Sequence, residues 1–332
     1  MGWASENHGP QRKHFITTVG DIWWWSGFIA FVVAMLALDL GFFQRKPHKP
    51  SLREALVWSM VWVGLALLFN MGLYLWFGPQ CALEFFTGYL IEKALSIDNV
   101  FVILVILTYL AVPAELHHKI LFWGIFGALV MRCFFVVAGA ALLRNFHWTI
   151  YIFGALLLIT GLRLFVHRES RFEPLKNPLV RLFSAVMPVA KEYRGTSFTV
   201  VEAGRRHATP LLLALVAVEA SDLLFALDSI PAIFAITPDP FIVFTSNVFA
   251  MLGLRSLYFL LAGVIGRFRY LKAGLALTLA FVGLKMLLAA FYDIPTVWSL
   301  GVVALLIGGS ILLSVARTSE PSAGRPFAPG LD

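Results

Sequence analysis

Residues 92–100 read Glu-Lys-Ala-Leu-Ser-Ile-Asp-Asn-Val and lie inside an otherwise apolar run over about residues 85–110. Residues 222–231 read Asp-Leu-Leu-Phe-Ala-Leu-Asp-Ser-Ile-Pro, inside a similar run over about residues 211–236. Both stretches begin with an acid and, after five residues, give Asp, a small polar residue and a β-branched residue. A charge in hydrocarbon costs about 2.5–3.5 kcal/mol. The matched acids therefore predict a compensating partner, and we expect a metal cation in transit.

The composition is that of a membrane protein. Of 332 residues, 59% are hydrophobic and 14% are charged, whereas about a quarter of the residues in a soluble domain are charged. Repeated apolar runs of about 20 residues are long enough to cross a bilayer as helices. The two cysteines, Cys81 and Cys133, are expected at different depths, which disfavours a disulfide framework. The first apolar run is too long for a cleaved signal peptide, so a retained helix is predicted.

We predict an all-α, polytopic membrane helix bundle with about nine transmembrane helices. An N-terminal segment (1–21) precedes a transmembrane domain (22–316), and a disordered tail (317–332) rich in Pro, Ser and Gly follows it. The expected helices cover approximately residues 22–43, 54–77, 82–110, 119–143, 147–166, 209–236, 241–265, 270–291 and 296–316.

Basic residues predict the orientation. The connections after the first, fifth and seventh expected helices are rich in Lys and Arg, and those after the second, sixth and eighth contain neither. Because cytoplasmic loops carry the positive charge, we expect the N-terminus outside and the C-terminus in the cytoplasm. The formal net charge of +7 is then a sign of topology, and no nucleic-acid partner is expected. We expect the chain to lie in a lipid bilayer.

The long connection over residues 167–208 is expected to be a cytoplasmic linker between two halves. Apolar residues recur at helical spacing over residues 179–187, which predicts a short amphipathic helix on the inner membrane surface. Residues 197–201 and the following Ala-Gly-Arg-Arg favour a small hairpin.

Charged and small residues at matched offsets indicate an internal repeat, first over about residues 82–166 and again over about 209–291. Three helices followed by three similar helices have opposite orientations in the membrane. Such inverted repeats are typical of secondary transporters, whose substrate site lies near the midplane. The matched positions are Arg132 with Arg255, Arg144 with Arg267, and Gly161 with Gly283.

A helix turns about 100° per residue, so Glu92, Ser96 and Asn99 share one face, and Asp98 lies beside it. On the other acidic helix Asp222, Ala226 and Ser229 share the equivalent face, with Glu219 and Asp228 beside it. The two faces are expected to meet and to present a ring of oxygens. Pro231 cannot donate a backbone hydrogen bond, so we expect that helix to bend or unwind near Asp228.

Oxygen ligands of this kind suit hard divalent cations such as Mn²⁺, Mg²⁺ or Ca²⁺. No histidine lies beside the acidic stretches, which disfavours a zinc or copper site. The alternative for each acid is an ion pair between helices, for which Lys93, Arg132, Arg163, Arg255 and Lys285 are available. Glu92 and Glu219 could equally gate the path, carry a proton or hold an arginine.

Other polar positions have simpler interpretations. Asp39 and Glu84 lie near helix ends, where water or a local partner can reach them. Asn70 is expected to bind a neighbouring helix, with a place as a peripheral ligand of the ion as the alternative. The tryptophans over residues 23–25 are expected to lie at the outer membrane interface.

Four segments resemble the TerC/Alx family of bacterial integral membrane proteins: Leu-Asp-Leu-Gly (38–41), Ser-Leu-Arg-Glu-Ala-Leu (51–56), the run over residues 85–101, and Ala-Ser-Asp-Leu-Leu-Phe-Ala-Leu-Asp-Ser-Ile-Pro-Ala (220–232). The resemblance implies a manganese efflux protein of the LysE-like transporter superfamily, named historically for tellurite resistance. It also implies an ion path formed by Glu92, Asp98, Asn99, Glu219, Asp222 and Asp228.

The first functional hypothesis is therefore export of Mn²⁺ as a transported substrate, with no bound cofactor and with proton movement or the membrane potential as the driving force. The alternative is an assembly or metallation factor for membrane proteins that carries out no transport. An intramembrane hydrolase is disfavoured because the sequence has no His-Glu-x-x-His or Gly-x-Ser-x-Gly motif. No enzymatic activity is expected, and the oligomeric state is left open.

Overall fold

The fold is all-α apart from one small hairpin. The computed structural model describes residues 18–43, 51–146, 148–166, 175, 177–190, 192–202, 204–262, 270–289, 291–292 and 294–317. Its helices are α1 (Ile22–Phe43), α2 (Leu52–Phe77), α3 (Pro79–Tyr109), η1 (Ala114–Leu116), α4 (His117–Asn145), α5 (Thr149–Val166), α6 (Pro178–Val186), α7 (Pro210–Phe234), α8 (Pro240–Leu252), α9 (Leu254–Ala262), α10 (Leu271–Leu288) and α11 (Thr296–Arg317).

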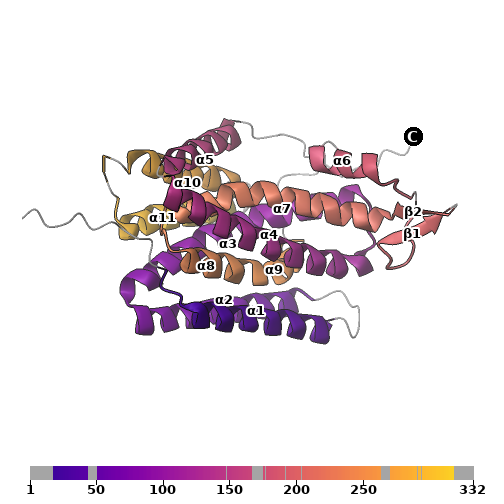
Figure 1. Ribbon diagram of the computed structural model, residues 1–332, viewed down its shortest axis with the longest axis horizontal. Helices are drawn as coiled ribbons and strands as arrows, with labels where there is room; N and C mark the ends of the chain where they lie inside the picture. Colours follow the sequence, from indigo (N-terminus) through magenta and orange to yellow (C-terminus); the bar gives the residue numbers. More distant parts are fainter. Residues whose placement is uncertain are drawn as a thin grey trace, which may run out of the picture.

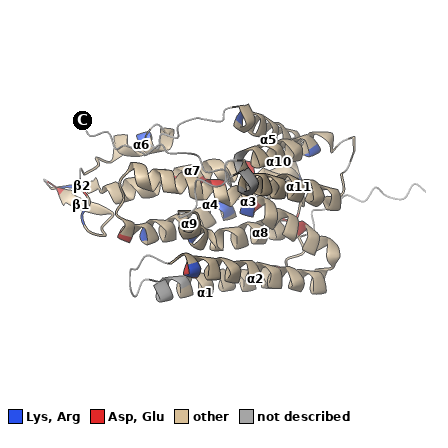
Figure 2. Ribbon diagram, turned by 180° about the vertical axis from the view of Figure 1, so that it is seen from behind, with Lys and Arg blue, Asp and Glu red and all other residues tan. Residues whose placement is uncertain are grey.

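The long helices run along one axis of the molecule, and α3 lies among them (Figure 1). It contacts α2, α7, α8, α9, α10 and α11. This central place explains a charged helix in an apolar bundle, because a polar group in a membrane protein is tolerated when other helices surround it. Charged residues also occur in the middle of the bundle, where α3, α4 and α7 approach one another (Figure 2).

Length and composition identify five helices that could each cross a membrane, or up to six if the bent pair α8 and α9 is one span, among the described residues. The apolar parts of α1 and α10 are shorter, and α3 carries Glu84, Glu92, Lys93 and Asp98 along its length. The all-α membrane fold is confirmed, whereas the count of nine spans stays a prediction. Most of the expected N-terminal segment (1–21) and nearly all of the tail (317–332) lie outside the described residues.

An aromatic cluster joins the first two helices to the bundle. Phe28 of α1 lies 5.5 Å from Phe69 of α2 and 5.7 Å from Phe249 of α8, measured between ring centroids. Phe69 in turn lies 5.2 Å from the buried Phe85 of α3. Rings at such separations contribute about 0.5–1.5 kcal/mol beyond the area they bury, so aromatic packing helps to hold α1 and α2 against the bundle.

The expected unwinding of the acidic second-half helix near Asp228 is wrong, and the expected bend there stays a prediction. Here α7 runs without a break from Pro210 to Phe234 and includes Pro231. The break occurs one helix later, because the single helix expected over residues 241–265 is divided at Gly253 into α8 and α9, with a bend of 40°. A proline removes one hydrogen bond, and near the end of a helix it leaves the remaining turn intact.

Lys93 of α3 stabilises the break. Its Nζ donates to the carbonyl oxygen of Ala250 over 3.3 Å, in the last turn of α8, where carbonyl groups lack partners within the helix. A cation also interacts favourably with the negative end of a helix. A Cβ on Gly253 would lie 2.8 Å from this ammonium group, so the glycine leaves room for it.

The helices α5 and α10 pack with their backbones in contact. A Cβ on Gly161 would lie 2.6 Å from the nitrogen of Ala280, and one on Gly283 would lie 2.6 Å from the nitrogen of Leu158. Each glycine therefore meets the residue three positions before the other glycine. Two helices related by a twofold axis make matching contacts of this kind. The packing of α5 against α10 is therefore consistent with the predicted repeat.

The linker folds as the sequence indicates. The amphipathic segment forms α6, and strands β1 (Thr199–Glu202) and β2 (Arg205–Ala208) form an antiparallel hairpin. Lys119 of α4 donates to the carbonyl of Thr196 and lies 4.4 Å from the centroid of the Phe198 ring. The hydroxyl of Tyr193 donates to the carbonyl of Leu110 over 2.7 Å. The linker is thus bound to the turn between α3 and α4.

Candidate functional site

A fully buried arginine occupies the centre of the site. Arg132 of α4 has no exposed surface, and its Nη1 donates to Glu92 Oε1 of α3. Its Nε and Nη2 donate to the two carboxylate oxygens of Asp222 on α7, over 3.4 and 3.3 Å. The faces of α3 and α7 that carry the first acid of each stretch therefore meet as expected, with a guanidinium group between them.

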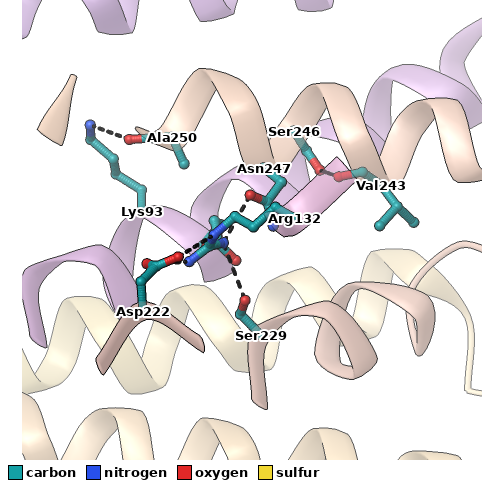
Figure 3. A network of polar contacts seen from close by, with 9 residues as sticks. Lys93, Arg132, Asp222, Ser229, Val243, Ser246, Asn247 and Ala250 are labelled. Atoms are coloured by element: carbon teal, nitrogen blue, oxygen red, sulfur yellow. Dashed lines mark hydrogen bonds and ion pairs between the residues drawn. The ribbon is translucent and has the colours of Figure 1, made fainter. Parts of the chain in front are cut away.

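Two neutral side chains complete the surroundings of the guanidinium group. Nη1 of Arg132 donates to Asn247 Oδ1 of α8 over 2.8 Å and to Ser229 Oγ of α7 over 3.3 Å (Figure 3). Arg132 therefore joins α3, α7 and α8 from a fourth helix. One positive and two negative charges give the group a formal charge of −1.

Several buried polar atoms around this group have no hydrogen-bond partner in the described part of the chain. They belong to one face of α3 and to α8: Glu92 Oε2, Ser96 Oγ, Asn99 Oδ1 and Nδ2, and Asn247 Nδ2. The three α3 side chains are spaced by four and three residues, and each is at most 3% exposed. Most buried polar atoms in proteins are paired, and an exception often marks a place for water or an ion.

A cavity of about 20 Å³ lies beside Asn99, mainly between α3, α4 and α7. Its wall includes the polar side chains of Asn99, Ser221 and Asp222, and the remainder is apolar. A volume of this size is enough for about one water molecule. The unpaired amide of Asn99 thus faces a space that also reaches a carboxylate from the opposite half of the chain.

The six residues expected to bind metal are not gathered at one point. Glu92 and Asp222 meet on Arg132, and Asn99 meets Asp222 across the cavity. Asp98 is partly exposed and lies off the buried face of α3. The described residues contain no group of three or more His, Cys, Asp or Glu side chains placed to hold a metal ion, so the six-ligand site stays a prediction.

The two remaining acids contact other helices. Asp228 accepts a hydrogen bond of 3.1 Å from Thr160 Oγ1 of α5. Glu219 lies directly against Gly127 of α4, where a Cβ would overlap its carboxylate. Both side chains are partly exposed in the structure. Asp222 and Asp228 therefore have different surroundings although they lie in one acidic stretch.

Two polar contacts were not anticipated from the sequence. Asn247 belongs to the polar triplet Thr-Ser-Asn (245–247) within an apolar helix, and all three side chains are fully buried. That triplet was a usable signal, because polar residues inside a membrane helix usually face another helix. Thr160 has no such signal, since a single threonine commonly bonds to its own helix.

Comparison with known proteins identifies the family. A model of the "Integral membrane protein TerC family" matches residues 77–322. An uncharacterized membrane protein of Myxococcus xanthus is 53% identical over 312 residues, which cover 94% of this chain and 98% of the relative. A protein of Escherichia coli (strain K12) named "Putative membrane-bound redox modulator Alx" is 47% identical, over 87% of this chain and 92% of its own.

An uncharacterized membrane protein of Rickettsia bellii is 38% identical, over 88% of this chain and 97% of the relative. No solved structure matches. The family model covers well over half of the 332 residues, and the relatives align over almost their entire lengths. This chain therefore belongs to the integral membrane protein TerC family.

Proposed function

We propose that this protein is a transporter that exports divalent metal cations, with Mn²⁺ as the expected cargo. The observation that supports it is the row of buried oxygens on α3, from Glu92, Ser96 and Asn99, each with an atom that has no hydrogen-bond partner within the described chain. Carboxylate, hydroxyl and amide oxygens are the ligands that Mn²⁺ and Mg²⁺ prefer. The row lies beside Asp222, which belongs to the opposite half of the predicted repeat.

The same atoms explain why a carrier suits the site better than a permanent metal centre. A resident metal would need a complete, preformed set of ligands, and the described residues bring together only part of one. A transported ion must instead be bound loosely enough to leave. We place the protein in the bacterial inner membrane, with its N-terminus outside and its C-terminus in the cytoplasm, and we assign it no enzymatic reaction.

The name of the Alx relatives suggests a redox role as a second candidate. Here the two cysteines, Cys81 on α3 and Cys133 on α4, are both free and partly buried. They lie on different helices, and no disulfide joins them. The oxygens of the buried site favour transport over this candidate.

The decisive experiment is flux of divalent cations into and out of liposomes that contain the purified protein. Wild type should carry Mn²⁺. Comparison with Mg²⁺ and Ca²⁺ measures the selectivity among cations, and comparison with and without a pH gradient measures the coupling to protons. Glu92→Gln and Asn99→Leu should lose most of the flux, because the first removes the negative charge and one carboxylate oxygen, and the second removes the amide oxygen.

The matched control is Glu115→Gln, which makes the same chemical change at an exposed position in η1. It should carry Mn²⁺ as wild type does. Equal flux through wild-type protein and the two site variants would rule out the proposed ion path. Failure of well-folded wild-type protein to carry any divalent cation would rule out the transport function itself.

A further inference from the structure

We propose that Arg132 is a resident counter-ion, which occupies the place between Glu92 and Asp222 when no cargo is bound and is displaced when a divalent cation enters. The inference rests on the proposed transport function and deepens it. With Arg132 between them, the two buried acids need no protons when the empty carrier returns across the membrane.

The geometry of Arg132 is that of a substitute cation. Its guanidinium group is fully buried, is bidentate on Asp222 and also bonds Glu92, so it fills the position that a shared metal ion would take. The two acids come from α3 and α7, and Arg132 comes from α4. A metal cation bound by both acids would compete with this guanidinium group for the same carboxylate oxygens.

Charge balance explains why such a group is needed. With Arg132 in place, the three buried side chains have a formal charge of −1, and without it the two acids have a charge of −2. Removing one partner of a buried ion pair leaves an uncompensated charge, which is strongly unfavourable. An empty carrier without Arg132 would therefore be trapped in a state that requires a metal ion or protons.

Arginine suits this role because it stays protonated at every physiological pH. Exchange between guanidinium and cargo then replaces one cation by another without a proton step. The surroundings also give the displaced group somewhere to remain, since Asn247 Oδ1 and Ser229 Oγ accept from Nη1 on the side of α7 and α8. The oxygens without partners, on Glu92 and Asn99, lie on α3.

The test separates net transport from exchange. Arg132→Gln is reconstituted in liposomes, and radioactive Mn²⁺ is followed in two ways: net efflux into metal-free buffer, and exchange with unlabelled Mn²⁺ on both sides. Net efflux requires the empty carrier to return, whereas exchange does not. We expect net efflux to fall about a hundredfold or more, because a buried charge is left uncompensated, while exchange stays close to the wild-type rate.

A second variant guards against simple misfolding. Arg132→Lys keeps a positive charge between the two acids, so net efflux should recover in part relative to Arg132→Gln, although an ammonium group lacks the planar fork with which the guanidinium group bonds both acids. Arg163→Gln, which changes an exposed arginine on α5, is the matched control and should retain both activities.

Three results would overturn the inference. They are unchanged net efflux in Arg132→Gln, loss of exchange together with net efflux in folded protein, and no recovery in Arg132→Lys. Absence of both activities in wild type would instead refute the proposed transport function, on which the inference depends.

Discussion

The contact between α5 and α10 can be tested by adding a single methyl group. In Gly161→Ala the new Cβ would lie 2.6 Å from the nitrogen of Ala280, whereas ordinary contact begins at 3.4 Å. The two helices would therefore have to separate by about 0.8 Å, because the atom that is met belongs to a backbone. Overpacking of this kind typically costs about 1–3 kcal/mol. Gly283→Ala should cost a similar amount, because it meets Leu158 at the same distance.

The assay is thermal unfolding of the purified protein in detergent. A cost of about 1 kcal/mol lowers Tm by roughly 2–4 °C in a protein of some 150–250 residues and by less in a longer one, so each variant of this 332-residue chain should lose a few degrees. The matched control is Gly301→Ala on α11, where a Cβ would meet nothing within 4 Å. It should keep or slightly raise Tm, because alanine favours a helix over glycine. If Gly161→Ala behaved like Gly301→Ala, the close backbone packing would be refuted.

Three further predictions concern single polar contacts. Lys93→Met should lower the free energy of unfolding by about 1.5–3 kcal/mol, and Tm with it, because it removes a charged donor from the carbonyl of Ala250. An unchanged melting curve would contradict the role given to Lys93. Thr160→Val should reduce Mn²⁺ flux in liposomes without altering Tm by more than a few degrees, because it removes the hydroxyl that orients Asp228; wild-type flux would argue against a part for that acid. Burial raises the pKa of Tyr193 above its usual value of 10.0, so its contribution to stability is complete below about pH 10 and is lost as the pH rises through the raised pKa. Tyr193→Phe should make the linker easier to cleave by protease at neutral pH and should remove that part of the alkaline loss, both measured against wild type.

Helical periodicity was sufficient to predict which side of α3 and α7 is buried. Residues spaced by four and three positions, such as Glu92, Ser96 and Asn99, lie on one face, and the structure buries all three. The same reasoning placed Asp98 and Asp228 off those faces. The short helix α6 and the hairpin were predictable as well, because their patterns are local.

Interactions between distant helices were not predictable in this way. The sequence offered five basic residues as partners for the acids, and nothing in their spacing selects Arg132, since the choice depends on how α4 packs against α3 and α7. The break at Gly253 has a similar origin. A proline was the stronger local signal for an interruption, but an ammonium group from another helix stabilises the carbonyl end of α8 at a glycine.

The two acidic stretches match in sequence, and the first acid of each binds the same cation, Arg132. Arg132 has a counterpart in Arg255, which lies beside Trp62 and Phe122 at the wall of a different hollow. Because Glu92 and Asp222 meet across the boundary between the halves, a single guanidinium group can serve both, and a second would bring two positive charges together. A duplicated pattern thus leads to an asymmetric site, in which the first acids of the two stretches share one arginine, while Asp228 accepts a hydrogen bond from Thr160.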